Sequence, residues 1–378
     1  MSYQFRFSHI LVLLLLNACN TSKINSEKTS PTLSIKKDTF KTKPRNIILM
    51  IGDGMGLSQI TAGMYSNNNK LELERCSHIG LHKAHSSDNL ITDSAAGANA
   101  FSIGMKTKNG HLGLDSLNRS HQTILEEAES KGFATGLVVT STIVHATPAA
   151  FFSHQTDRDE YENIALDLLK TDIDLIIGGG KKYFDRRNND SLNLITDLRD
   201  HDYLVTDYFE QDFDNWTFPV ANKIVYFTAD GDPLPVSNGR KYLPKATKDA
   251  IDFLKLKSEK GFFLMVEGSQ IDWGGHANDA NYIITEVLDF DQAIKHALDF
   301  AQLDQNTLVI ITADHETGGF SINSGKKFGE LKTSFTSKNH TADLIPVFAF
   351  GPGAELFSGI YENTEIYKKM YKLLFSTK

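Results

Sequence analysis

Asn46-Ile47-Ile48-Leu49-Met50-Ile51 is an apolar run that ends at Gly52-Asp53-Gly54-Met55-Gly56. A short apolar run that stops at glycine is typical of a strand buried on both faces of a parallel sheet. Similar apolar runs follow farther along the chain, at 135–140, 173–177, 262–266, 308–312 and 345–350. The first run therefore predicts one strand of a larger, repeated pattern.

Longer stretches with helical patterning separate these runs, at 121–131, 158–170, 246–257, 279–301 and 364–375. Strands that alternate with helices predict an α/β fold, with a doubly wound, mostly parallel central sheet and helices on both faces. Segment 181–245 breaks the rhythm because it is polar and rich in Asp and Asn. We expect it to be an insertion within one domain, 44–378, and not a second domain.

Composition and charge narrow the classes of partner. The chain has 378 residues, of which 40% are hydrophobic and 23% charged, the balance of a soluble globular protein. The formal net charge of -8 argues against nucleic acid as a partner, because binding it usually requires a basic face. An anionic small molecule is not excluded, since bound metal ions can be the largest local charges in a site.

The N-terminal residues predict a signal peptide at 1–18. Arg6 precedes a short apolar run, 10–16, which ends at Leu16-Asn17-Ala18-Cys19. The run is too short for a membrane-spanning helix of about 20 residues, and a small residue before Cys19 is typical of bacterial lipoprotein processing sites. We expect a lipid on Cys19, a solvated tether over 19–43 and a periplasmic or cell-surface location. The alternative is a cleaved signal peptide without a lipid.

Cys76 is then the remaining cysteine of the chain. With Cys19 lipidated, no intramolecular disulfide can form. We expect Cys76 to be a packed residue, since only His78 lies near it in ligand spacing.

Acidic and histidine residues gather where the expected strands end. In open α/β sheets, ligands bind outside the carboxyl ends of the strands. Carboxylate and imidazole together suit zinc, whereas carboxylates, a Thr hydroxyl and water suit magnesium. Taken singly, each residue could instead be a helix cap, a turn residue or a surface pair. The residues concerned are Asp53, Glu267, Asp272, His276, Asp314, His315 and His340.

This set holds enough ligands for more than one ion. Two metal ions a few ångströms apart can hold the attacking and leaving oxygens of a displacement reaction. The segment Ile91-Thr92-Asp93-Ser94-Ala95-Ala96-Gly97-Ala98 places Ser94 at an expected helix N-terminus, where free N–H groups favour an anion. Ser94 is a candidate nucleophile there, and the alternative is a helix cap.

At this point the sequence resembles the alkaline phosphatase family over about residues 45–378, more weakly across 181–245. The motifs that carry the resemblance occur in the family's order. They are Asp53-Gly54-Met55-Gly56, Thr92-Asp93-Ser94-Ala95-Ala96, Ala146-Thr147-Pro148-Ala149-Ala150, Glu267-Gly268, Asp272 with His276, Thr312-Ala313-Asp314-His315 and His340-Thr341.

The resemblance implies a role for each matching residue. Ser94 would take the phosphoryl group, and Arg158 would grip two phosphate oxygens with its planar fork, which suits that task better than lysine. Two zinc ions and one magnesium ion would be bound. The first zinc would be held by Asp272, His276 and His340, the second by Asp53, Asp314 and His315, and the magnesium by Asp53, Thr147 and Glu267.

Two positions depart from some family members. His145 stands where some have Asp, and Trp273 where some have Lys. We expect His145 to lie behind the third metal and to hold a water bound to it. Trp273 would contact substrate or shield the site.

The resemblance thus implies hydrolysis of small phosphate monoesters through a phosphoserine, by a homodimer. The motif at Leu16 to Cys19 separately predicts that the enzyme is attached to the membrane only through Cys19. One alternative is a phosphodiesterase or sulfatase of the same superfamily. Another is a non-catalytic lipoprotein that binds metal or phosphate. Intact Ser94 and Arg158 argue against it, since metal storage needs neither.

Overall fold

The computed structural model describes Met1, residues 43–219 and residues 223–376, and its fold lies within one compact unit, Phe40–Lys378. The expected signal peptide, Cys19 and nearly all of the tether lie outside the described residues. Within them, no helix combines the length and the apolar character needed to cross a membrane. Cys76 is buried, with 6% of its surface exposed, as expected of a packed residue.

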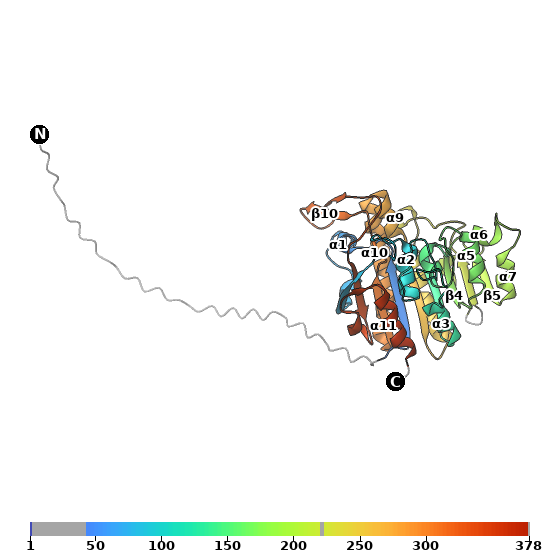
Figure 1. The fold of residues 1–378 in the computed structure, drawn as a ribbon. Helices are drawn as coiled ribbons and strands as arrows, with labels where there is room; N and C mark the ends of the chain where they lie inside the picture. Colours follow the sequence, from blue (N-terminus) through green and yellow to red (C-terminus); the bar gives the residue numbers. More distant parts are fainter. Residues whose placement is uncertain (2–42, 220–222, 377–378) are drawn as a thin grey trace. The chain divides into compact units, whose positions relative to one another are not determined.

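A central ten-stranded sheet organises the described residues (Figure 1). Neighbouring strands run parallel except at β13, which is antiparallel to both β2 and β8. The predicted α/β fold with a mostly parallel sheet is therefore confirmed. In sheet order the strands are β14 (Gly359–Glu362), β2 (His78–Lys83), β13 (Ile345–Phe350), β8 (Thr307–Thr312), β1 (Asn46–Gly52), β7 (Phe262–Gly268), β3 (Ala134–Thr142), β4 (Leu175–Gly179), β6 (Lys223–Phe227) and β5 (Tyr203–Asp207).

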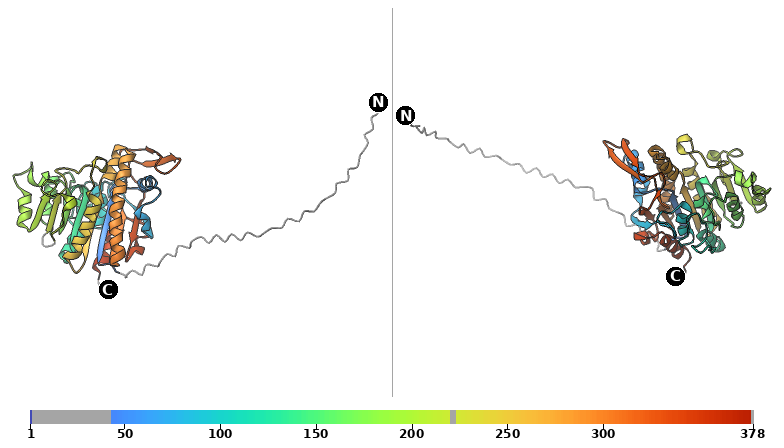
Figure 2. Two further views of the ribbon diagram at one scale, coloured as in Figure 1. Left: turned by 180° about the vertical axis from the view of Figure 1, so that it is seen from behind. Right: turned by 45° about the horizontal axis from the view of Figure 1, so that its top comes forward.

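Helices cover both faces of this sheet (Figure 2). In β1, Ile47, Leu49 and Ile51 point into one core and Ile48 and Met50 into the other, because successive side chains of a strand point to opposite faces. The first core is closed by α2 (Ser94–Ser102), α3 (Ile124–Ser130), α4 (Ala146–Ala149), α5 (Tyr161–Leu168), α6 (Lys182–Asp185), α7 (Leu194–Asp200) and α11 (Thr364–Phe375). The second is closed by α1 (Leu57–Ser66), α8 (Tyr242–Lys257), α9 (Gln270–Ala277) and α10 (Ala280–Asp304).

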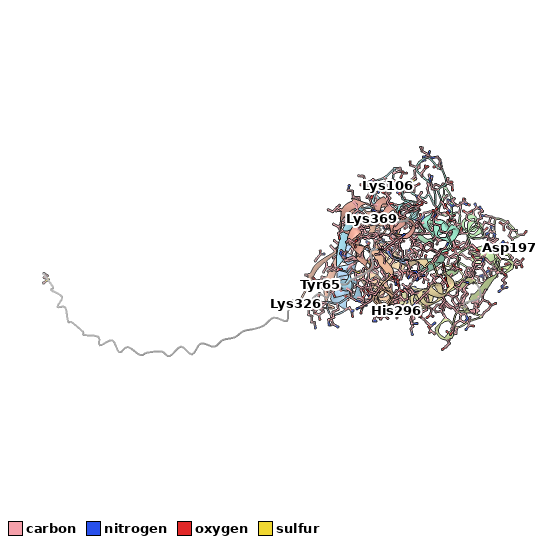
Figure 3. All side chains as sticks on the ribbon, turned by 90° about the horizontal axis from the view of Figure 1, so that it is seen from below. Tyr65, Lys106, Asp197, His296, Lys326 and Lys369 are labelled. Atoms are coloured by element: carbon pink, nitrogen blue, oxygen red, sulfur yellow. The ribbon has the colours of Figure 1, made fainter. Side chains whose placement is uncertain are left out.

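Segment 181–245, which we expected to be an insertion, adds to this sheet. Its strands β6 and β5 pair in parallel beyond β4. In Figure 3, Asp197 of α7 accordingly lies at the opposite end of the molecule from Tyr65 and Lys326. Lys326 belongs to the turn of a separate hairpin, β10 (Phe320–Gly325) with β11 (Leu331–Phe335).

The five expected helical stretches are observed as α3, α5, α8, α10 and α11, of which α11 has the expected bounds and the others have shifted ends. Helix α8 begins at Tyr242, four residues before the expected start, and includes Pro244 in its first turn. Proline is tolerated there because a first-turn N–H has no partner within the helix. Helix α10 starts where Asp279 accepts the N–H groups of Asn281 and Tyr282, which is an ordinary aspartate cap.

Candidate active site

Four adjacent strands of the sheet bring the predicted residues together. In sheet order β8, β1, β7 and β3 are neighbours. Asp314 and His315 follow β8, Asp53 follows β1, Glu267 is the second-last residue of β7, and Thr147 follows β3. The carboxyl ends of parallel strands meet at one edge of the sheet, so residues far apart in the chain become neighbours.

Ser94 is the first residue of α2, and its hydroxyl faces this edge. The cap of the helix is Asp93, whose carboxylate accepts the N–H of Ala96 at 2.9 Å. Capping is therefore done by Asp93, and Ser94 remains available for other chemistry. Ser94 is 2% exposed, and its Oγ lies 3.3 Å from Nε2 of His315.

Glycine at position 97 permits this approach. A Cβ on Gly97 would lie 2.8 Å from the Cβ of Asp314, closer than side chains pack. The first turn of α2 can therefore rest directly on the strand end that carries Asp314 and His315.

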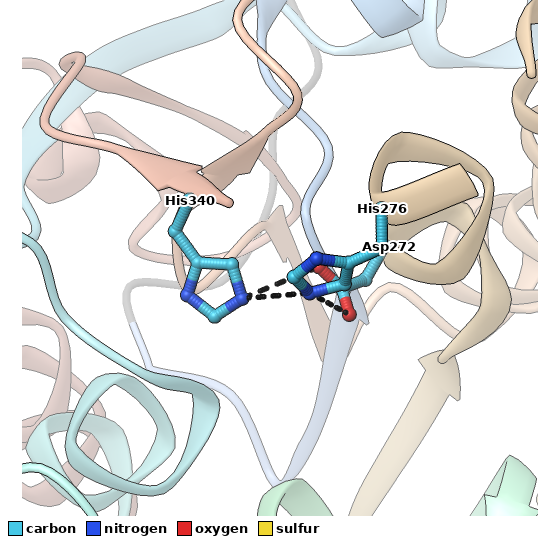
Figure 4. Close-up of side chains that lie close together, drawn as sticks. All are labelled: Asp272, His276 and His340. Carbon is cyan, nitrogen blue, oxygen red and sulfur yellow. Dashed lines mark hydrogen bonds and ion pairs between the residues drawn. The ribbon is translucent and has the colours of Figure 1, made fainter. Parts of the chain in front are cut away.

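Asp272, His276 and His340 form the first group of ligands (Figure 4). Nε2 of His276 lies 3.1 Å from Nε2 of His340 and 3.3 Å from the Asp272 carboxylate. His340 stands on β12 (His340–Thr341), which pairs with β9 (Glu316–Thr317). The carbonyl groups of Lys338 and Thr92 lie against the Nδ1 atoms of His276 and His340, at 2.6 and 2.8 Å. Such contacts orient the Nε2 atoms toward a common point.

A second group surrounds His315, which is fully buried. Its Nε2 lies 3.0 Å from the Asp314 carboxylate and 3.5 Å from that of Asp53. Ligand atoms of Asp53, Asp272 and His315 lie within 4.8 Å of one another. The rings of His315 and His340 stack with centroids 3.5 Å apart, so the first and second groups are contiguous, with Asp272 common to both.

A third group joins Asp53, Glu267 and a nitrogen of His145 within 4.8 Å. Thr147 Oγ1, both carboxylate oxygens of Asp53 and Oε1 of Glu267 are buried, and none has a hydrogen-bond partner among the described residues. Buried polar atoms without partners are costly. His145 was expected behind the third metal, and its place in this group is also compatible with direct ligation.

Burial and mutual repulsion make the ionised forms of these carboxylates costly. Burial raises the pKa of Asp53, and the charges of Asp314, Asp272 and Glu267 raise it further. Burial, together with the charge of Asp314, raises the pKa of Glu267 to about 8. Burial likewise lowers the pKa of His145 to about 3, which keeps its imidazole neutral. Carboxylates and neutral imidazoles are the donor set that divalent zinc and magnesium accept, so the residues fit these ions.

Arg158 and Trp273 lie beside these groups. Nη1 of Arg158 donates to Asp93 at 3.1 Å, and Nη2 lies 3.4 Å from Nε2 of His145. The ring of Trp273 packs edge-on against His145, with centroids 6.2 Å apart. Arg158 is thereby tied to the residue that precedes Ser94.

The sequence analysis did not identify two residues of this site, Asp93 and Thr317. Asp93 bridges Arg158 and the start of α2. It could have been identified from the sequence as a helix cap, because an aspartate often precedes the first residue of a helix. Thr317 contacts both Asp272 and His315 through its hydroxyl. No periodic pattern marks it, because its position depends on the long-range pairing of β9 with β12.

The fold and the three ligand groups together define a metal-dependent α/β enzyme. Residues 44–334 match the alkaline phosphatase family, and the chain belongs to that family. Alkaline phosphatase 3 of Bacillus subtilis is 34% identical over 90% of this chain and 91% of its own. The Escherichia coli alkaline phosphatase is 32% identical over 88% of this chain and 87% of its own.

Solved structures agree. The alkaline phosphatase of the Antarctic bacterium TAB5 superposes with a TM-score of 0.84 and 42% identity, over 89% of this chain and 99% of that one. A histidine-to-aspartate mutant of the same enzyme, with magnesium bound in its M3 site, is also similar, with a TM-score of 0.84 and 41% identity over the same shares. The protein is therefore a hydrolase of phosphate monoesters, and the non-catalytic alternative is not supported.

Proposed function

We propose that the protein hydrolyses phosphate monoesters through a phosphoserine on Ser94, at a site for two zinc ions and one magnesium ion. The observation that carries the proposal is the position of Ser94 Oγ, 3.3 Å from His315, beside buried carboxylate oxygens that lack hydrogen-bond partners among the described residues. A hydroxyl at a helix N-terminus within such a cluster is suited to receive a phosphoryl group.

The proposed ligands follow the three groups of the site. The first zinc would be held by Asp272, His276 and His340, the second by Asp53, Asp314 and His315, and the magnesium by Asp53, Thr147 and Glu267 with His145 beside them. In the first group, and in the third group for Asp53, Glu267 and His145, the ligand atoms lie close enough together to bind one metal ion. In the second, Asp314 is supported by its 3.0 Å approach to His315.

The chain's own residues would act in two displacements. Ser94 Oγ attacks phosphorus, the bond to the alcohol oxygen breaks, and the alcohol leaves. Water then attacks the phosphoserine, and Ser94 and inorganic phosphate are released. Arg158, held by Asp93, binds two phosphate oxygens in both steps. The metal ions, when bound, supply the positive charge that activates the nucleophile and neutralises the phosphoryl oxygens.

Replacement of the nucleophile tests this proposal. Ser94→Ala should abolish the phosphoenzyme trapped at acid pH and lower the turnover of a chromogenic phosphate monoester by several orders of magnitude, with metal content unchanged. Ser102→Ala is a matched control, because Ser102 is buried in the same helix and bonds only a backbone carbonyl. Labelled phosphate on any residue other than Ser94 would contradict the assignment.

Phosphodiester hydrolysis is the alternative within the superfamily. Rates for a monoester, a diester and a sulfate ester with one leaving group would separate the two. A diester rate above the monoester rate would favour the alternative.

Two further properties are proposals from the sequence and the family. We propose a lipid on Cys19, and Cys19→Ser should then release the enzyme from the membrane fraction or block its processing. We also propose a homodimer, which sedimentation of the purified enzyme would test. A monomer at all concentrations would contradict it.

A further inference from the structure

The hydroxyl of Thr317 lies between two side chains that are proposed to hold different zinc ions. Thr317 is fully buried on β9. Its Oγ1 donates a hydrogen bond to Oδ1 of Asp272 and lies 3.2 Å from Nδ1 of His315. Its backbone is also paired with that of His340. One residue thus touches ligands of both proposed zinc ions.

The number of protons available determines which of the two partners of this hydroxyl accepts a hydrogen bond and which donates one. A threonine hydroxyl has one proton to donate and lone pairs to accept with, whereas an ionised carboxylate only accepts. The proton therefore goes to Asp272. Since the hydroxyl then accepts from His315, the proton of the neutral imidazole is on Nδ1.

This tautomer leaves Nε2 of His315 with a free lone pair. Nε2 is the atom that faces the site, at 3.0 Å from Asp314, 3.5 Å from Asp53 and 3.3 Å from Ser94. A metal ligand needs such a lone pair, and the hydrogen bond on the other ring nitrogen decides which atom carries it.

The packing around Thr317 holds the hydroxyl in this position. A Cβ on Gly275 would lie 2.8 Å from both Cβ and Cγ2 of Thr317, and a Cβ on Gly54 would lie 2.7 Å from its Oγ1. The side chain therefore fills a closed space between two glycines. Rotation about χ1 would move Oγ1 away from Asp272 and His315 and break both contacts.

We propose that Thr317 is a positioning residue that orients Asp272, sets the tautomer of His315 and thereby couples zinc binding at the first and second sites. The inference rests on the proposed function, since it assumes zinc at both sites. Its consequence is that loss of one hydroxyl weakens both sites together, although Thr317 itself ligates no metal.

Three variants and a control test the proposal on the full enzyme. Thr317→Val replaces the hydroxyl by a methyl group and keeps the shape of the side chain. Thr317→Ala removes the hydroxyl without adding a methyl group in its place. Thr317→Ser retains the hydroxyl. Thr247→Val is the control, because Thr247 is equally buried but its hydroxyl bonds only the carbonyl of Leu243, at 2.9 Å. Zinc per protein is measured against a zinc-buffering chelator, with the folded state checked by circular dichroism.

We expect Thr317→Val and Thr317→Ala to weaken zinc binding at both sites by about 10- to 100-fold, the usual effect of losing a partner of a metal ligand. Thr317→Ser should stay within a few-fold of the wild type, and Thr247→Val should not change. Affinity unchanged in the Val or Ala variant, or weakened at one site only, would overturn the proposal.

The tautomer gives a readout that does not depend on any variant folding. Two-bond proton–nitrogen NMR of the zinc-loaded wild type should show the His315 proton on Nδ1. A proton on Nε2 would overturn the inference. If the wild type itself does not bind two zinc ions, the proposed function fails and this inference fails with it, whereas two bound zinc ions with an unaffected Thr317→Val variant contradict only the role of Thr317.

Discussion

Arg158 depends on its neighbours for its position. Its guanidinium donates to Asp93 and lies against His145, so the rest of its fork is free to bind phosphate. A fork of N–H donors can bind two oxygens at once, whereas an ammonium group acts as a point charge.

We therefore expect Arg158→Lys to lower kcat/KM for a chromogenic phosphate monoester by about tenfold or more, since one charge-assisted hydrogen bond contributes about 1.5–3 kcal/mol. Arg158→Ala should lower it further. Arg186→Lys serves as the control, because Arg186 is half-exposed and paired with Asp185 and Asp230. Steady-state kinetics measure the effect, and wild-type kcat/KM in Arg158→Lys would contradict the bidentate role.

His145 belongs to the third group of potential metal ligands. Its neutral imidazole places a ring nitrogen beside two carboxylates, those of Asp53 and Glu267. Magnesium prefers oxygen ligands, whereas imidazole suits softer metals. We predict that His145→Asp lowers the magnesium concentration needed for full activity and leaves two zinc ions per chain.

A magnesium titration of dialysed enzyme and elemental analysis test this prediction. His296→Asp on α10 is the control, since His296 belongs to none of the three groups. An unchanged magnesium requirement in His145→Asp, or loss of zinc, would show that His145 does not tune the third site.

The sequence could name residues that the structure brings together at this site, but it could not give their hydrogen-bond partners. Asp53, Asp314 and His315 follow apolar runs, and the ends of parallel strands meet in space. Thr317 carries no such signal, because its role comes from a two-residue strand whose pairing with β12 is set by the tertiary fold.

At the scale of elements, the packing of α2 on the end of β8 sets the position of Ser94, the proposed nucleophile. The helix starts at Ser94, and a Cβ at Gly97 would meet Asp314 at 2.8 Å. Alanine is the better helix former by about 1 kcal/mol, so glycine at 97 is explained by the close approach and not by helix propensity.

Gly97→Ala should therefore displace the first turn of α2 and lower kcat about tenfold or more, since small misplacements of reacting groups are costly. Gly63→Ala in α1 is the matched control. Its added Cβ would meet Val287 at 2.5 Å, so stability should fall while kcat stays near wild type. Kinetics and thermal unfolding of both variants test this, and wild-type kcat in Gly97→Ala would contradict the packing argument.

Some strands could be predicted from the sequence and others could not, and the difference has a physical reason. The strands buried on both faces, such as β1 and β7, are continuous apolar runs and were identified. An apolar run does not show strand direction, so the antiparallel course of β13 could not be read from it. Strand β5 alternates buried and half-buried residues at the edge of the sheet, and its surrounding polar segment concealed it.

At the scale of the whole molecule, acidic residues gather at both ends of the strands of the central sheet. The carboxyl ends of the strands carry the three potential metal-ligand groups, with buried carboxylates. Acidic residues also gather at the other end, where Glu129 of α3 lies near Asp172 and Asp174, which precede β4. Among the described residues, this end holds no group of side chains that could bind a metal ion.

Burial raises the pKa of Glu129 to about 8, and the charges of Asp174 and Asp172 add to the rise, while Lys223 and the hydroxyl of Thr135, which donates to the carboxyl group, oppose it. An unfolded glutamate has a pKa of about 4.3. Between these values the folded protein keeps a proton that the unfolded chain has lost. The contribution of Glu129 to stability is thus present below about pH 4.3 and is lost as pH rises through about 8.

Glu129→Gln should remove this loss, because an amide stays neutral and its oxygen still accepts from Thr135. Relative to wild type, the free energy of unfolding of the variant should rise from about pH 5 to about pH 8 and stay constant above it. Glu127→Gln, on the same helix but paired with Lys131 at 3.1 Å, should show a small effect, as surface ion pairs do. Urea unfolding across this range measures both variants. If the difference in free energy of unfolding between Glu129→Gln and wild type does not change with pH, the carboxyl group of Glu129 is ionised in the folded enzyme. The acidic residues at this end of the sheet would then all carry their charges in the folded state.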